Sequence, residues 1–454
     1  MAFLSETDAA ALLHKVLSFS KADECQAKLD GGRDGNLRFA RNAVSTSGES
    51  DTLSLEVQSS FGKRTGVTTI NEFDDASLEK VVRRSEELAK LAPENPEYVP
   101  FLGPRTYVRP PSYIESSANL EPDFRATAAA ASMDLCKKQG FVAAGFQSDS
   151  ATFSAIANTK GLYGYQQRTG IQFSVTVRSQ DSKSSGYAVA DFNDASKLDT
   201  AALTSYALNK AVLSRDAKAI EPGKYTVVLE PAASVDLISH MISSMDARLA
   251  DEGRSFLSKA GGGTRLGEKL MDAQVSIYSD PLSQEIPGDA WDTEGRPRAR
   301  VDWIKEGVVA NLAYSRYWAQ KKGLQGDGTP GIGSNQQSEV GVFEGAQGFI
   351  MSGGTASTEE LIKTVKRGVL VTRMWYIRPV DPQTLLFTGL TRDGTFYIED
   401  GVIKYPIKNF RFNESPVIML NNVEALGRPQ RTNACLVPPM VLRDFTFSSL
   451  SDAV

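Results

Sequence analysis

The chain has 454 residues, of which 41% are hydrophobic and 23% charged, which is ordinary for a globular protein of two or three domains. Its formal net charge of −5 argues against a nucleic-acid-binding protein that works by general electrostatics, because such proteins usually carry a basic excess. No stretch approaches the roughly 18 apolar residues of a membrane span, and the N-terminus has no basic region before an apolar core. The sequence therefore predicts neither a transmembrane helix nor a signal peptide.

The cysteines and histidines are few and far apart. Cys25, Cys136 and Cys435 form neither a disulfide framework nor a CxxC metal motif, so we expect a reducing cytoplasm. A zinc site built mainly from histidine would need both His14 and His240, the only two in the chain. His14 has apolar neighbours at helical spacing and is interpreted as structural.

The first ninety residues alternate between helical and strand-like patterns. An amphipathic helix is predicted over 7–18, and strand-like runs follow over 25–30, 37–47, 52–60 and 64–70. Phe61-Gly62-Lys63 is typical of a hairpin turn between the last two runs. A helix is expected over 73–92, with its acidic start and Ser77 near the N-terminal cap.

A proline-rich stretch then separates two similar units. Residues 93–111 contain six of the 20 prolines, which favours an extended linker, placed at 93–112. Helix, antiparallel strands and helix recur over 121–216. We interpret residues 1–92 and 113–222 as α+β domains that arose by internal duplication.

Residues 223–454 read as a strand-rich domain with one long helix, expected over 235–250. The tripeptides at 392–394 (RDG) and 399–401 (EDG) are interpreted as hairpin turns. The predicted fold class is therefore α+β, with duplicated N-terminal helix–antiparallel-strands–helix units and this strand-rich C-terminal domain.

The helix over 235–250 carries the first candidate site. Its apolar stripe predicts a core face, and His240 lies on the opposite face, with Asp236 one turn before it and Ser244 one turn after. The three residues are candidates for substrate binding, although a solvated helix pair explains Asp236 and His240 as well. A hydrolytic triad is disfavoured, because three side chains in line along one helix point poorly at one another.

A second candidate segment is VTRMWYIRPVDPQT, residues 371–384. Arg373, Trp375, Tyr376 and Arg378 are typical of a peptide or anion site, and alternation in a half-buried strand is the competing interpretation. The GxGxxG at 326–331 contains Pro330 and follows no strand, so a loop is expected there. Cys435 is interpreted as a buried thiol.

Four long stretches resemble one family. They are residues 47–97, the segment GRSFLSKAGGGTRLGEKL (253–270), the segment DTEGRPRARVDWIKEGVVANLAYSRYWAQKKG (292–323) and the hairpin GLTRDGTFYIEDGVIKYPI (389–407). Together they make the chain similar, over nearly its full length, to the TldD/PmbA family, also called gyrase modulators and understood as peptidase components.

The resemblance implies a choice between two branches. TldD-like chains carry an HExxxH zinc motif on the helix after a VVL strand, plus a distant cysteine. Counted from VVL here (227–229), that motif falls on Ser239 to Ser244: both ligand positions are serine, and the general-base position is His240. Counting back from GRSF shifts the frame by one, and the motif is still absent. The segment around Cys435 also resembles the PmbA (TldE) ending.

The resemblance thus implies a PmbA/TldE-like, non-catalytic subunit with no catalytic residue, metal or cofactor of its own; zinc would sit in a TldD-like partner. We expect peptide as the substrate, no direct nucleic-acid or membrane contact, and either that partner or a homodimer. The expected substrate-binding residues are Asp236, His240, Ser244, Arg373, Trp375 and Arg378. The alternative is a stand-alone homodimeric peptide-binding protein without peptidase activity.

Overall fold

The computed structural model describes residues 3–324, 333–334 and 348–451. The glycine motif at 326–331 lies outside these residues. Among the helices described, none combines the length and the apolar character that a membrane span requires.

The N-terminal half contains two units with the same order of elements, as the sequence predicts. The first is α1 (Glu6–Ser18), β1 (Glu24–Ala40), β2 (Ala43–Phe61), β3 (Arg64–Ile70) and α2 (Asp75–Leu91). The second is α4 (Pro122–Lys138), β4 (Phe141–Asn158), β5 (Tyr163–Ser179), β6 (Ser185–Phe192) and α5 (Thr200–Leu213), preceded by the short α3 (Glu115–Ala118) and with the turn η1 (Ala195–Lys197) before α5.

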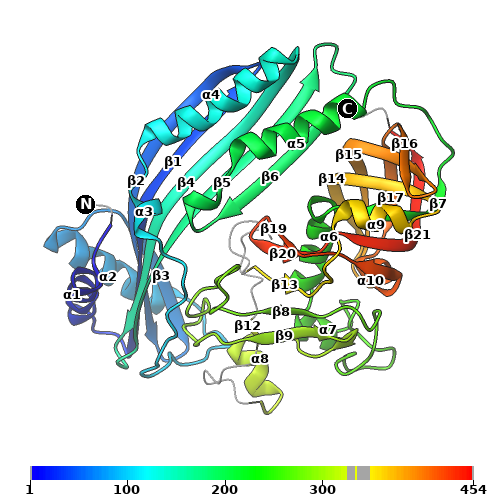
Figure 1. Cartoon of the computed structure of the whole chain (residues 1–454). Helices are drawn as coiled ribbons and strands as arrows, with labels where there is room; N and C mark the ends of the chain where they lie inside the picture. Colours follow the sequence, from blue (N-terminus) through cyan, green and yellow to red (C-terminus); the bar gives the residue numbers. More distant parts are fainter. Residues whose placement is uncertain (1–2, 325–332, 335–347, 452–454) are drawn as a thin grey trace.

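Both units contribute to one sheet. Its antiparallel order is β3-β2-β1-β4-β5-β6, so the first strands of the two units pair at its centre, from Gln26 with Asn158 to Phe39 with Gly145 (Figure 1). The division at residues 93–112 is therefore not a division into two sheets. The segment runs without regular structure between the sheet and the C-terminal domain, and Arg248 pairs with its Glu97 at 2.8 Å.

Local turn chemistry corrects one predicted strand. Residues 37–47 do not form one strand, because Arg41 and Asn42 both have positive φ (52° and 55°) and turn β1 back into β2. The predicted turn at Gly62 (φ 56°) is present. Asp74, rather than Ser77, caps α2, since its side chain accepts from the Ser77 backbone N–H.

The four helices α1, α2, α4 and α5 all pack on the same face of this sheet. Side chains of β1 alternate, so Cys25 and Leu29 pack under α1 and α2 while Leu37 and Phe39, on the same face, pack under α4 and α5. The opposite face is polar and lies toward the C-terminal domain; for example, Arg168 of β5 pairs with Asp289 at 2.9 Å. This face is part of the candidate site.

The C-terminal half contains two larger sheets. The seven-stranded sheet comprises β7 (Gly223–Leu229), β14 (Arg367–Asp381), β15 (Leu386–Glu399), β16 (Val402–Pro406), β17 (Phe410–Glu414), β18 (Val423–Leu426) and β21 (Met440–Leu450). It closes on itself, because β14 pairs with both β7 and β15. The second comprises β8 (Ile277–Ser279), β9 (Val301–Lys305), β10 (Val308–Val309), β13 (Ile350–Met351), β19 (Gln430–Thr432) and β20 (Cys435–Val437).

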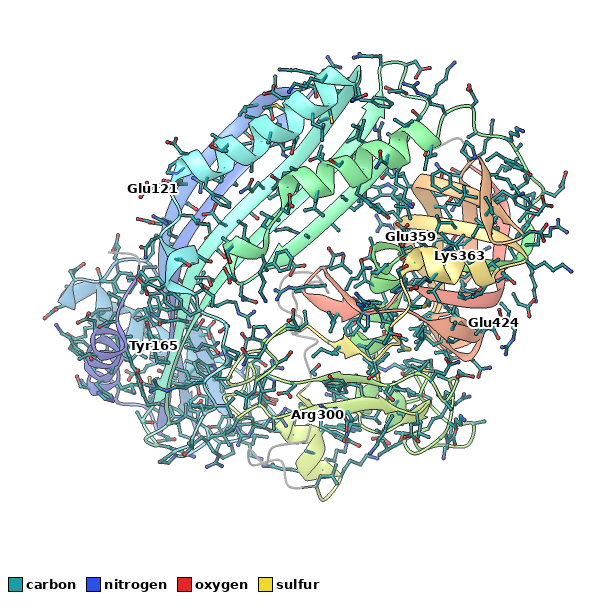
Figure 2. The ribbon with its side chains drawn as sticks, in the orientation of Figure 1. Glu121, Tyr165, Arg300, Glu359, Lys363 and Glu424 are labelled. Atoms are coloured by element: carbon teal, nitrogen blue, oxygen red, sulfur yellow. The ribbon has the colours of Figure 1, made fainter. Side chains whose placement is uncertain are left out.

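Short elements complete this domain: α8 (Arg316–Lys321), α9 (Thr358–Thr364), α10 (Pro416–Asn421) and the pair β11 (Ala313–Tyr314) and β12 (Gly333–Ser334). Figure 2 labels Glu359 and Lys363 on α9 and places Arg300 at the start of β9; the Arg300 guanidinium lies 3.7 Å from the ring centroid of Tyr278. The predicted hairpin turn at 399–401 is present, with Gly401 at φ 73°.

Two further predictions in this domain are wrong. Residues 392–394 lie within β15 and not at its end; Asp393 (φ 56°) accompanies an irregularity in the β14–β15 register, so they form a bulge. The helix expected over 235–250 is two helices, α6 (Pro231–Ser243) and α7 (Ala247–Asp251). The Ser243 and Ser244 hydroxyls donate to the carbonyl of His240 (3.0 and 2.7 Å), which competes with continuation of the helix, and Asp246 caps α7.

Candidate functional site

Helix α6 follows β7 directly and packs on β14, β19 and β20. Glu230 precedes Pro231, which occupies the first turn, where its missing N–H is not needed. Val235, Ile238 and Met245 of the predicted core stripe are fully buried, whereas Ile242 and Leu249 are half-buried. The opposite face of α6, with Asp236 and His240, is half-buried.

His240 is not on an open surface, which corrects the interpretation of a solvated face. Its ring stacks on Phe387 of β15, with centroids 4.8 Å apart and planes inclined by 23°. Burial lowers the pKa of His240 below its ordinary value of 6.5, so the neutral imidazole is favoured. Phe387 thus covers the His240 ring, a contact between distant segments that helical periodicity does not reveal.

Asp236, His240 and Ser244 do not form a chain of side-chain hydrogen bonds suited to nucleophilic catalysis. The Ser244 hydroxyl donates to the backbone carbonyl of His240, and not to its ring. Asp236 accepts from the side-chain amide of Asn433 at 3.3 Å, and burial raises its pKa. The geometry agrees with the sequence argument against a triad on this helix.

The structure brings Cys435 of β20 to α6. Burial raises the pKa of its thiol to about 12, although the Ser239 hydroxyl lies within hydrogen-bonding reach and lowers it. Ser239 is the first position that the resemblance aligns with the zinc motif of TldD-like chains, so Cys435 contacts the helix that carries those positions. The sequence offered no local sign of this contact.

These residues do not fit a zinc ion. Zinc sites use thiolates, imidazoles and carboxylates, whereas a protonated thiol and neutral serine hydroxyls are poor ligands. In the parts of the chain that the structure describes, no three His, Cys, Asp or Glu side chains come together as a metal site. Ser239, Ser244 and Cys435 are therefore a poor set of zinc ligands.

Arg373 and Trp375 lie in a second feature, an open cavity of about 410 Å³ between the polar sheet face and β14–β15. We call it the arginine groove, and its charged and aromatic lining residues are Arg38, Phe39, Phe146, Arg178, Tyr187, Arg373, Trp375, Arg392 and Asp393. The Arg373 guanidinium lies 3.7 Å from the ring centroid of Tyr187 on β6 and donates to Asp393 at 3.0 Å.

The six predicted substrate-binding residues thus divide into groups. Asp236 lies close enough to Arg373 for the arginine to lower its pKa against the larger effect of burial, so these two are brought together. His240 and Ser244 lie farther along α6. Arg378 is exposed beyond the β14 irregularity and lies over the ring of Tyr376, outside the residues that line the arginine groove.

Sequence reasoning missed Arg38, Arg178 and Arg392. Arg38 and Arg178 occupy the polar face of their strands, and the alternation with buried neighbours is a signal that could have been used. Arg392 was hidden within a tripeptide interpreted as a turn. The pairing of β1, β4 and β5 brings Arg38 and Arg178 together, and the pairing of β14 with β15 brings Arg373 and Arg392 together. The contact of β15 with β6 then places both sets at one cavity.

Solved structures share this architecture. TldE from Thermococcus kodakarensis superposes with a TM-score of 0.85 at 18% identity, covering 97% of this chain and 99% of that one. A Thermotoga maritima protein described as a candidate modulator of a DNA gyrase gives the same TM-score and identity, covering 97% of this chain and 100% of that one. At this level of identity the likeness shows the fold.

The sequence itself gives the family. The C-terminal, central and first domains of the PmbA/TldA metallopeptidases match residues 222–449, 112–215 and 29–89. The chain belongs to the PmbA/TldD metallopeptidase family.

Two curated relatives agree with this membership. "Metalloprotease PmbA" of Escherichia coli O157:H7 is 20% identical over 96% of this chain and 95% of that protein. A "Metalloprotease" of Methanothermobacter thermautotrophicus is 27% identical over 48% of this chain, and the match spans about half of that relative's length (46%).

Proposed function

We propose that this chain is the PmbA/TldE-like, non-catalytic subunit of a two-component metallopeptidase that processes unfolded peptides. A TldD-like partner would carry the zinc ion and the general base. The proposal places this chain in the cytoplasm, where a TldD-like partner would also lie.

The observation that carries the proposal is the set of side chains on α6. The resemblance aligns the zinc motif of TldD-like chains with Ser239 to Ser244, where its ligands are absent, and Cys435 contacts the same helix. The helix and the cysteine are therefore in place, but the side chains at these positions are serine hydroxyls and a protonated thiol. An arrangement of this kind suits a subunit that retains the family's shape and leaves the metal chemistry to a partner.

A role in binding extended peptide also agrees with the polar face of the N-terminal sheet. Hydroxyl and amide side chains such as Gln172, Ser174 and Thr176 alternate along β5 with buried residues, on the face that lies toward the C-terminal domain. An extended peptide presents unpaired backbone N–H and C=O groups that such side chains can satisfy.

The test compares three samples on an unfolded protein substrate: this chain, a TldD-like chain from the same source, and the two mixed. We expect cleavage by the mixture, its loss with a chelator, and one complex on size-exclusion chromatography. The matched control is a TldD-like chain whose motif glutamate is replaced by glutamine, which should abolish cleavage and leave the complex intact.

Zinc-dependent cleavage by this chain alone would refute the proposal. A homodimer that binds peptide and forms no complex with the TldD-like chain would support the alternative, a stand-alone peptide-binding protein. Both outcomes are read from the same chromatography and activity measurements.

A further inference from the structure

Strand β2 has a partner on both sides along only part of its length. β1 pairs with it from Ala43 to Ser60, whereas β3 pairs only with Leu55 to Phe61. In the part of the chain that the structure describes, no other strand pairs with residues 43–54. These residues therefore form an open edge of the sheet, which we call the β2 edge.

The side chains of the β2 edge are exposed on both faces. Every residue from 43 to 52 is exposed, whereas Leu55 and Val57 farther along the strand are buried under α1 and α2. A Cβ added to Gly48, near the middle of the edge, would have no heavy atom within 4 Å. The backbone N–H and C=O groups that point away from β1 are therefore accessible to an extended chain.

The β2 edge lacks the usual protection against an added strand. Proteins block open edges with lysine, proline, bulges or very short strands. Residues 43–54 (AVSTSGESDTLS) contain neither lysine nor proline. The irregularity in the β1–β2 register lies at Arg38 and Phe39 of β1, so the pairing is regular from Thr46 onward. The edge is thus long and regular enough to accept another strand.

Two carboxylates, Glu49 and Asp51, are the charged side chains of this edge, and they lie on the same face because they are two residues apart. Glu49 pairs with the buried Arg125 of α4. Asp51 is exposed, and Arg33, opposite it in the register, donates instead to two backbone carbonyls before α4 at 2.9 and 3.0 Å. A basic residue on an added strand would pair with Asp51 across the two strands.

The same side chains discriminate between possible occupants. Two copies of this chain paired edge to edge would bring together Glu49 and Asp51 of each, which is unfavourable. Stable subunit interfaces use large anchors such as tryptophan, tyrosine and arginine, whereas the exposed large apolar side chain of this edge is Val44 alone. Backbone hydrogen bonding without side-chain pockets suits an extended peptide of varied sequence.

We propose that the β2 edge binds an extended segment of a peptide substrate as an additional strand, with a preference for basic side chains on the face of Asp51. This inference rests on the proposed function in its choice of a peptide as the occupant. Thr52 lies in one cross-strand row with Gly32, Thr152 and Arg168, on the polar face of the sheet. A strand bound at the edge would therefore extend the face to which the proposed function assigns peptide binding.

The first experiment measures fluorescence anisotropy of labelled peptides with the full chain. The probes are a peptide of alternating threonine and lysine, the same peptide with glutamate for lysine, and the lysine peptide N-methylated at every central residue. We expect the second and third probes to bind at least about tenfold more weakly than the first. N-methylation keeps the charge and removes the backbone donors, so it separates strand addition from simple attraction to an acidic protein.

Hydrogen exchange locates the bound peptide. We expect the lysine peptide to slow amide exchange in residues 43–54 and to leave residues 55–61, already paired with β3, unchanged. Asp51→Lys should weaken binding of this peptide by about fivefold. The matched control is Glu424→Lys, the same change of charge at an exposed position of β18, which should have no effect (Figure 2). If Asp51→Lys fails to fold, Asp51→Asn and the exchange pattern still decide the question.

Equal binding of the lysine peptide and either comparison peptide would overturn the proposal, as would its full binding by Asp51→Lys or protection that excludes residues 43–54. Protection of these residues without peptide, in a dimer of this chain or in the complex with a TldD-like subunit, would also overturn it, because the edge would then be an interface.

Failure of the proposed function gives a different result. In that case the chain forms no complex with the TldD-like subunit, while the lysine peptide still protects the β2 edge. Conversely, a complex that cleaves an unfolded protein without any peptide-dependent protection of residues 43–54 would refute only the inference about the edge.

Discussion

The ammonium group of Lys210 lies 2.5 Å from a carboxylate oxygen of Glu230, and both side chains are about nine-tenths buried. Lys210 belongs to α5 of the N-terminal half, whereas Glu230 precedes α6 of the C-terminal half. The Tyr206 hydroxyl donates to the second carboxylate oxygen, and burial beside Glu230 raises the pKa of that tyrosine well above 10. One buried carboxylate therefore joins the two halves next to the candidate site.

We predict that Lys210→Met lowers the free energy of unfolding by about 3 to 5 kcal/mol, because it leaves Glu230 buried without its counter-charge. Urea unfolding followed by circular dichroism measures this change. The double variant Lys210→Met, Glu230→Leu should recover much of the loss, since it removes both charges. A double variant no more stable than the single one would show that the carboxylate was not the cause.

A second prediction concerns Gly35, which lies over the buried Arg125. A Cβ at Gly35 would lie 2.0 Å from Nη1 of Arg125, whose side chain is 1% exposed and held by Asp149 at 2.8 Å. Gly35→Ala should therefore destabilise the chain by about 1 to 3 kcal/mol, as overpacking does.

Gly48 is the matched control, because it lies on the neighbouring strand and a Cβ there meets nothing within 4 Å. Gly48→Ala should be neutral or slightly stabilising by thermal unfolding. Equal midpoints for the two variants would contradict the packing argument.

Local patterns in the sequence predicted the elements better than their assembly. The helix at 7–18, the turn at Gly62 and the turn at Gly401 were found, because periodicity and glycine conformations are local properties. The turn at Arg41–Asn42 was missed, since neither residue is a glycine. The bulge at Asp393 was mistaken for a turn, because a glycine after an aspartate has a positive φ in both.

The candidate site depends on contacts between distant segments. Arg373 and Trp375 were recognised from their own strand, but Tyr187 and Arg38 join them only through the fold. Covering of His240 by Phe387, and the approach of Cys435 to α6, likewise result from tertiary packing. A single sequence contains no periodic signal for such contacts.

A third prediction concerns the thiols. Burial raises the pKa of Cys435 to about 12 and that of Cys136 to about 11, and it raises that of Cys25 as well. Because the thiolate is the reactive form, iodoacetamide at about pH 8 should label none of the three in the native chain and all three in urea. Mass spectrometry counts the labels; rapid native labelling of Cys435 would refute its burial against α6.

The same thiols predict a loss of stability at high pH. The unfolded thiol ionises near 9.0, below the raised pKa of the folded state, so the folded chain retains more protons above that pH. Their contribution is present below pH 9.0 and is lost as the pH rises toward about 12. Cys435→Ala should reduce this dependence of the free energy of unfolding on pH, although it also leaves a small cavity.

His240 gives the opposite dependence at low pH. Its folded pKa is lowered by burial, whereas the unfolded imidazole takes up a proton near 6.5, so below that pH the unfolded state binds more protons. The stability that neutral His240 contributes is therefore present above pH 6.5 and is lost as the pH falls. We expect the free energy of unfolding to decrease as the pH falls below 6.5, and His240→Asn to flatten this decrease relative to the unmodified chain. His14→Asn is the matched control, because it removes the only other histidine and leaves α6 intact. Urea unfolding at several pH values measures the slopes, and an unchanged slope in His240→Asn would show that the imidazole is not held neutral against Phe387.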